Sequence, residues 1–97
     1  MGKKICFVLW LSLYCWLDLA AQNEATKIKN DITLFSNYLD RNLDSAHFYI
    51  RRAHAKSLVL KNDSLLARTY YNLGYYYYLN NKADSSKMYL NKGFQFA

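Results

Sequence analysis

The stretch NLGYYYYLNN, residues 72–81, decides how this chain is expected to fold, because four tyrosines follow a glycine in a chain without proline. Residues three, four and seven positions apart share one face of a helix. One stripe with this spacing contains Tyr70, Leu73, Gly74 and Tyr77. A glycine inside a helix costs about 0.5–1 kcal/mol relative to alanine, and close approach of a facing helix is the usual reason to tolerate it. We therefore predict that this first stripe packs against another helix.

The other tyrosines of this region divide between a second stripe and one unassigned position. Tyr71, Tyr75 and Tyr78 also share a helical face, which is rotated away from the first stripe. Two interpretations of the second stripe stay open: recognition of a partner, or packing against a neighbouring pair of helices. Tyr76 fits neither stripe and is expected to face a neighbouring element or solvent.

The chain after residue 22 is predicted to be all-α, because it lacks proline and repeats its apolar positions every three to four residues. Four helices are expected, at residues 27–40, 43–60, 64–79 and 83–97, after a polar lead-in at 22–27. Asn and Asp occupy each break, and Asp63 is the clearest candidate for a helix N-cap. Connections of about three residues imply that consecutive helices are antiparallel neighbours.

The first 21 residues have the order of a secretory signal peptide. A positive start at residues 1–4 precedes an apolar run at 5–17 and the small residues Ala20 and Ala21. This run is shorter than the roughly 20 residues that a spanning helix needs. We therefore expect export to the periplasm or cell envelope, with cleavage after Ala20 or Ala21. An uncleaved anchor is the alternative, because Leu19 occupies a position that prefers a small residue.

Composition excludes several classes of function. Both cysteines, Cys6 and Cys15, lie within the predicted signal peptide, so the mature chain would have no disulfide, thiolate metal site or cysteine nucleophile. From residue 22 onward, eleven Lys/Arg and six Asp/Glu leave a net charge of +5, with Arg51-Arg52 as the only basic pair. Scattered charges of this kind indicate solvated helix faces, and we expect no nucleic-acid partner.

The polar residues offer no candidate for catalysis, a metal or a cofactor. His47 and His54 are separated by about 10 Å along one predicted helix, too far to share a metal without further ligands. Asp44, three residues before His47, adds only one weak group. Ser85-Ser86 has no adjacent base, and the chain has no glycine-rich phosphate loop. We therefore predict a protein that is not an enzyme and needs no cofactor.

An internal repeat is visible at an offset of 40 residues, where Tyr38-Leu39 aligns with Tyr78-Leu79. The same offset aligns the second stripe with three residues of the first copy, which are Asp31, Phe35 and Tyr38. Repeats of this length are typical of stacked helix pairs.

The second copy resembles the tetratricopeptide repeat, which places an aromatic residue, Leu-Gly and Tyr in one helix and small, large and small residues in the next. The matching residues are Tyr70, Leu73, Gly74 and Tyr77, then Ser86, Leu90 and Gly93. The first copy keeps the small-large-small spacing in Ala46, Ile50 and Ala53, although Leu34 stands where Gly74 does. The resemblance implies an α-solenoid of antiparallel helix pairs, with a degenerate repeat at 28–62 and a good one at 63–97.

In tetratricopeptide arrays the first helix of each pair lines a concave groove that binds peptides or other proteins. The resemblance therefore implies that the second stripe faces such a groove. The groove candidates are Arg68, Tyr71, Tyr75 and Tyr78, with Asp31, Phe35 and Tyr38 from the first copy. Tyrosine suits a binding surface because its ring is large and rigid and carries a hydroxyl.

The expected partner is a protein or peptide. Two repeats leave open ends, whereas solenoids need about three repeats and a polar cap. We therefore expect either a piece of a longer protein or a chain that self-associates through its C-terminal helix.

By resemblance, exported arrays of this kind form sensory N-terminal regions of bacterial membrane-anchored signalling proteins. Contact with the membrane would then come from an uncleaved signal or from a downstream segment. A small stand-alone envelope or assembly protein is the alternative.

Overall fold

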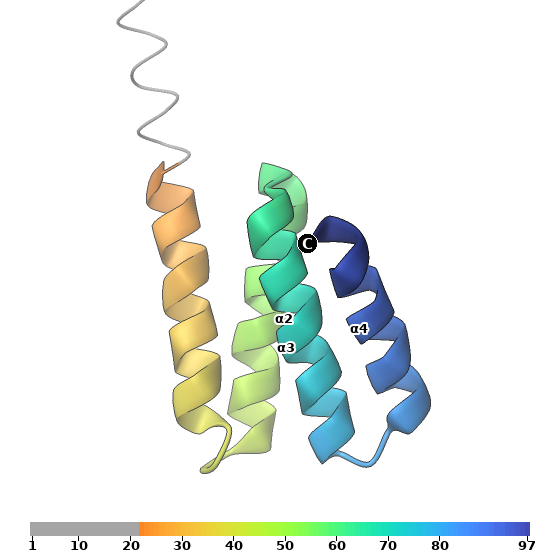
Figure 1. Ribbon diagram of the computed structural model, residues 1–97. Helices are drawn as coiled ribbons and strands as arrows, with labels where there is room; N and C mark the ends of the chain where they lie inside the picture. Colours follow the sequence, from red (N-terminus) through yellow and green to blue (C-terminus); the bar gives the residue numbers. More distant parts are fainter. Residues whose placement is uncertain (1–21) are drawn as a thin grey trace, which may run out of the picture.

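The computed structural model describes residues 22–97, and every regular element in this range is an α-helix. The first helix covers residues 22–38, and α2 (Leu43–Leu60), α3 (Asp63–Leu79) and α4 (Ala83–Phe96) follow after short turns. Consecutive helices run antiparallel (Figure 1). The predicted all-α fold of antiparallel helix pairs is confirmed, while the predicted signal peptide at 1–21 lies outside the described residues.

The boundaries differ from the prediction mainly at the first helix. Residues 22–27 are helical, so the prediction of a polar lead-in is wrong. Local side chains support this turn: Thr26 Oγ1 donates to the Gln22 carbonyl at 3.0 Å, and Lys27 Nζ lies 3.3 Å from Glu24 Oε1. The segment also lacks glycine and proline, so nothing in it breaks a helix.

Asparagine side chains cap two of the helices. Asn42 accepts a hydrogen bond from the Ser45 N–H at 3.1 Å before α2, and Asn62 accepts one from the Leu65 N–H at 3.1 Å before α3. Asp63, the predicted N-cap, is instead the first residue of α3, so that prediction is wrong by one position. Its carboxylate still lies in the first turn, where a negative charge interacts favourably with the helix dipole.

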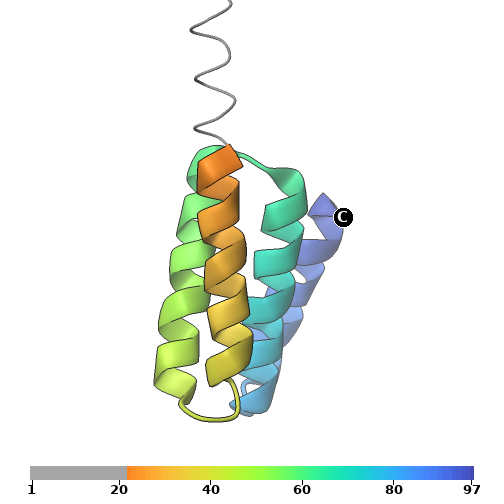
Figure 2. The same cartoon turned by 90° about the vertical axis from the view of Figure 1, so that its left-hand side faces the viewer.

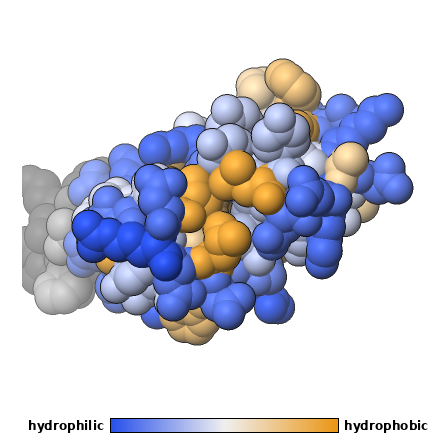
Figure 3. Space-filling model, turned by 90° about the horizontal axis from the view of Figure 1, so that it is seen from below, coloured by the Kyte–Doolittle hydropathy of each residue, from blue (hydrophilic) through white to orange (hydrophobic). Residues whose placement is uncertain are grey.

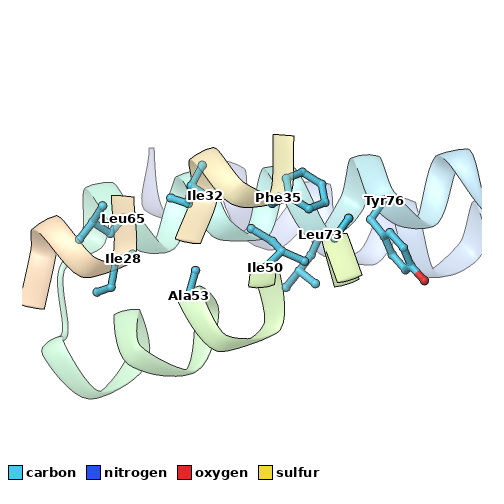
Figure 4. Packing of buried hydrophobic residues seen from close by; sticks show 9 residues of the cluster. Ile28, Ile32, Phe35, Ile50, Ala53, Leu65, Leu73 and Tyr76 are labelled. Carbon is cyan, nitrogen blue, oxygen red and sulfur yellow. The ribbon is translucent and has the colours of Figure 1, made fainter. Parts of the chain in front are cut away.

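One hydrophobic core joins the first helix, α2 and α3. Figures 1 and 2 show the first helix against α2 and α3, with α4 on the other side of α3. The buried cluster consists of Ile28, Ile32, Phe35, Ala46, Ile50, Ala53, Leu65, Leu73 and Tyr76 (Figure 4). The predicted core positions of α2, Ala46, Ile50 and Ala53, are fully buried, which confirms that part of the prediction.

Tyr76 belongs to this core, although the sequence pattern assigns it to neither stripe. Its side chain is only 6% exposed, and its ring stacks on His47 of α2 with the ring centroids 4.4 Å apart. Of the two expectations for Tyr76, a neighbouring element is therefore correct and solvent is not.

α3 and α4 approach each other closely at Gly74. A Cβ atom at this position would lie 2.7 Å from Leu90 Cγ, nearer than side chains tolerate. The Ser86 hydroxyl donates a hydrogen bond to the Gly74 carbonyl at 2.8 Å, and Gly93 is buried against the backbone of α3. The prediction that small residues let these two helices meet is confirmed.

Two half-buried tyrosines of α3 extend this seam. Tyr77 stacks on Tyr89 with ring centroids 5.2 Å apart, and Tyr70 stacks on Phe96 at 5.7 Å. Both partners lie on α4. Tyr70, Gly74 and Tyr77 of the first stripe therefore pack between α3 and α4 as predicted. Leu73 instead belongs to the core shared with the first helix and α2, so the prediction is wrong for this residue.

Each helix pair has one stack of two tyrosines, and matching these two stacks shifts the predicted repeat by one residue. Tyr38 stacks on Tyr49 at 5.5 Å, in the same way that Tyr77 stacks on Tyr89. Tyr49 and Tyr89 are 40 residues apart, but Tyr38 and Tyr77 are only 39 apart. The segment from Tyr38 to Tyr49 is thus one residue shorter than that from Tyr77 to Tyr89, and by this contact Tyr38 corresponds to Tyr77 and not to Tyr78. The same shift pairs Asp31 with Tyr70 and Phe35 with Gly74.

Candidate functional site

Four side chains of α3 form an exposed aromatic and basic surface, which we call the tyrosine face. Its members are Arg68, Tyr71, Tyr75 and Tyr78. The three tyrosines are 60%, 41% and 67% exposed, respectively. Their spacing of three and four residues turns them away from the core residue Leu73 on the same helix. The groove candidates of the second copy are therefore accessible to a partner.

A shallow hollow lies beside the tyrosine face, between the first helix and α3. Its volume is about 420 Å³, and its lining residues are Ile32, Ser36, Ala67, Arg68, Tyr71 and Asn72. Arg68 and Tyr71 belong to both features, so the hollow and the tyrosine face form one continuous surface.

The first helix contributes to this surface differently from the prediction. Asp31 is 3% exposed and Phe35 is 1% exposed, so the prediction that these two line a groove is wrong. Tyr38 is half-buried against Tyr49. The one-residue shift explains the error, because the residues that correspond to Tyr71, Tyr75 and Tyr78 are Ile32, Ser36 and Leu39.

Asp31 instead joins the first helix to α2 through a bidentate ion pair. Arg52 Nη2 lies 2.6 Å from Asp31 Oδ1, and Arg52 Nε donates to Asp31 Oδ2 at 3.0 Å. Lys56 Nζ is 4.0 Å from the same carboxylate. The hydrogen bond with Asp31 raises the pKa of Arg52, whose guanidinium lies 5.3 Å from the ring centres of Phe48 and Tyr49. This pair is a structural contact that orients the first helix.

His47 and His54 pack against tyrosine rings of α3. The planes of His47 and Tyr76 are 1° apart, and His54 meets the Tyr70 ring at 4.4 Å between centroids. His54 Nδ1 lies 3.0 Å from Thr69 Oγ1, within hydrogen-bond distance. Within residues 22–97, no three potential metal ligands lie close together. Both histidines therefore serve helix packing.

The half-buried His47 and His54 are expected to make the fold less stable as the pH falls below about 6.5. Burial lowers the pKa of both rings, assisted by Arg51 at His47 and by Lys92 at His54. Because the folded pKa is then below the unfolded one, the unfolded chain binds more protons and is favoured at low pH. Urea-unfolding midpoints should fall between about pH 7 and about pH 5. A His47→Gln/His54→Gln variant should show a flatter profile, and an equal slope would contradict this account.

Two further hollows lie along α2, away from the tyrosine face. One, of about 590 Å³, is lined by Asp44, His47, Phe48, Arg51 and Arg52. The other, of about 350 Å³, is lined by Glu24, Ala55, Lys56, Val59 and Leu60. His47 Nε2 is buried and has no hydrogen-bond partner among the described residues.

The end of the molecule with the turns before α2 and before α4 also carries apolar surface. Figure 3 shows hydrophobic side chains grouped among hydrophilic ones at this end. Leu43 at the start of α2 and Leu79 at the end of α3 are 37% and 41% exposed, respectively. Leu79 directly follows Tyr78, so apolar surface continues from the tyrosine face onto this end.

No family model, curated protein or solved structure matches the chain. None of the helices within residues 22–97 combines the length and the apolar composition of a membrane span.

Proposed function

We propose that this protein is an exported, non-catalytic interaction module that binds a protein or peptide through its tyrosine face. The observation that carries the proposal is a set of three exposed tyrosines on one helix, beside a hollow between two helices. Contiguous exposed apolar surface is typical of interaction sites. Tyrosine and arginine are also among the residues that most often dominate binding energy.

The support beneath the rings favours binding. α3 is held by the core on one side and by α4 on another, so the rings stand on a rigid helix. A rigid surface loses little conformational freedom when a partner docks. Arg68 adds a planar set of donors for a carboxylate or backbone carbonyl of the partner. An extended peptide or a helix that combines apolar and acidic groups fits this chemistry.

The wider setting of the module rests on the sequence. The resemblance of residues 63–97 to a tetratricopeptide repeat supports a tetratricopeptide-like stack, and the composition of residues 1–21 supports export to the periplasm or cell envelope. We propose the sensory region of a bacterial signalling protein as the biological context, by analogy with the family alone.

Selection of displayed peptides on the immobilised protein tests this function. Enriched peptides are expected to bind with micromolar affinity, measured by titration calorimetry. The Tyr75→Ala/Tyr78→Ala variant should bind them about tenfold or more weakly, which is about 1.4 kcal/mol or more. Both rings are exposed, so circular dichroism should show an unchanged fold.

Phe48→Ala provides a matched control, because this aromatic ring on α2 is 57% exposed but lies outside the tyrosine face. It should leave peptide affinity unchanged. Equal weakening by Phe48→Ala, or full binding by the double tyrosine variant, would refute the assignment of the site.

A further inference from the structure

One side of the α3–α4 pair is an exposed aromatic surface. Gly74 and Leu90 meet at the centre of the seam between these helices. Tyr71 and Tyr78 lie three residues before and four residues after Gly74, and Lys87 and Phe94 have the same positions relative to Leu90. At this spacing all four side chains turn to the same side of the antiparallel pair. With Tyr75 between them, they form what we call the stacking face: Tyr71, Tyr75 and Tyr78 on α3, and Lys87 and Phe94 on α4.

The corresponding side of the first pair is covered by α3. Because Phe35 and Ile50 correspond to Gly74 and Leu90, the equivalent positions are Ile32, Ser36, Leu39, His47 and His54. Ile32 is 5% exposed and lines the hollow toward α3. His47 and His54 both pack on tyrosine rings of α3. Apart from the exposed Ser36, these positions thus form a helix-packing surface once already within this chain.

The stacking face has the composition of a surface that is covered in use. Phe94 is 79% exposed, although phenylalanine is usually buried. A Cβ atom at Gly93, the residue before Phe94, would lie 3.5 Å from the Tyr71 backbone nitrogen, so α4 approaches α3 closely at this end of the seam. Four exposed rings in one patch are unusual on the surface of a monomer, and the polar residues beside them are Arg68, Lys87 and Asn91.

We propose that a second copy of this chain covers the stacking face in a two-fold symmetric dimer. In a head-to-tail stack, the outer face of the first helix would have to dock here. That outer face is exposed and polar, with Asn23, Lys27, Asn30, Thr33 and Asn37. Polar side chains do not complement four rings, whereas the stacking face complements itself, as an isologous interface requires.

The exposed area is enough for a reversible dimer. Aromatic side chains bury 150–250 Å² each, so four rings that are 41–79% exposed would bury roughly 1,000 Å² over both copies. Biological interfaces begin near this size. The long Lys87 side chain can extend its charge to the rim. An interface at this lower limit is typical of weak, reversible association, and we expect a dissociation constant in the micromolar to millimolar range.

This inference rests on the proposed interaction role. It names a second copy of the chain as the partner of Tyr71, Tyr75 and Tyr78, which belong to both the tyrosine face and the stacking face. Sedimentation velocity of the exported chain, from micromolar to millimolar concentration, should show a reversible monomer–dimer equilibrium. Phe94→Glu should raise the dissociation constant about tenfold or more, because it places two like charges in an apolar interface. Circular dichroism should show an unchanged fold, since Phe94 is exposed.

Val59→Glu is the matched control, because Val59 is 85% exposed on α2 and lies outside the stacking face. It should leave the dissociation constant unchanged. A chain that stays monomeric throughout, a dimer that tolerates Phe94→Glu, or equal weakening by both variants would overturn the dimer.

The peptide selection separates the two proposals. A monomeric chain whose selected peptides need Tyr75 and Tyr78 would overturn the second copy and leave the interaction role standing. A dimer sensitive to Phe94→Glu, together with peptides that ignore the tyrosines, would support the second copy and remove the wider role.

Discussion

Replacing Tyr76 by alanine is expected to lower the free energy of unfolding by about 3–5 kcal/mol. The ring is 6% exposed, stacks on His47 at 4.4 Å and meets the Tyr77 ring at 5.3 Å between centroids. Its removal would leave a cavity between α2 and α3 that neighbouring side chains fill only in part. Urea and thermal unfolding measure the loss, and each 1 kcal/mol should lower the melting temperature by about 4–8 °C in a domain of this size.

Tyr78→Ala is the control for this prediction, two residues further along the same helix. Tyr78 is 67% exposed, so its replacement should change stability by no more than about 0.5 kcal/mol. Similar losses from both variants would mean that α3 is not oriented as described.

Gly74→Val is the second substitution with a large expected effect, a loss of about 2 kcal/mol or more through overpacking. The new Cβ atom would lie 2.7 Å from Leu90 Cγ and 3.2 Å from the Ser86 carbonyl oxygen, and the valine methyl groups would add to this crowding. α4 would have to move away from α3, which would strain the hydrogen bond from Ser86 to the Gly74 carbonyl. The unfolding midpoint in urea measures the effect.

Gly93→Ala tests the same seam where space is sufficient. The nearest atoms to its Cβ, the Ala67 carbonyl oxygen and Tyr70 Cβ, would be 3.4 Å away, which is ordinary contact. Alanine is favoured over glycine inside a helix by about 0.5–1 kcal/mol, so this variant should be as stable as the native chain or slightly more stable. A loss at Gly93 as large as that at Gly74 would contradict the described seam.

The seam between α3 and α4 was predictable because its cause is local. A glycine in the middle of a helix must be compensated, and Gly74 therefore indicates where another helix comes close. The Asn-rich breaks likewise indicate the helix ends, since Asn side chains satisfy free backbone N–H groups. Both signals lie within a few residues of the feature that they predict.

The role of Tyr76 was not predictable from one helical period. α3 packs on α4 through Gly74 and on the first pair through Leu73 and Tyr76, so three directions around this helix are distinct. A stripe analysis of a single helix separates a packed face from an exposed one. It does not show that a helix lies between two partners.

The positions of Asp31 and Phe35 were missed for a different reason. The pairs Tyr38-Leu39 and Tyr78-Leu79 are identical, so an alignment without gaps places them together. The spatial match depends instead on the spacing of the stacked tyrosines, which is one residue shorter from Tyr38 to Tyr49 than from Tyr77 to Tyr89. The contact of Tyr38 with Tyr49 shows this difference. A shift of one residue rotates every position on a helix by about 100°, so it moves Asp31 and Phe35 to another face.

The hydrogen bond from Ser86 to Gly74 has a consequence for the order of folding. It joins residues only twelve positions apart across a three-residue turn, so the α3–α4 hairpin closes a short loop at small entropic cost. The contact of Tyr38 with Tyr49 spans 11 residues, so the first helix and α2 close a loop of similar length. Each helix pair should therefore form its local contacts early in folding, before the core between the two pairs assembles.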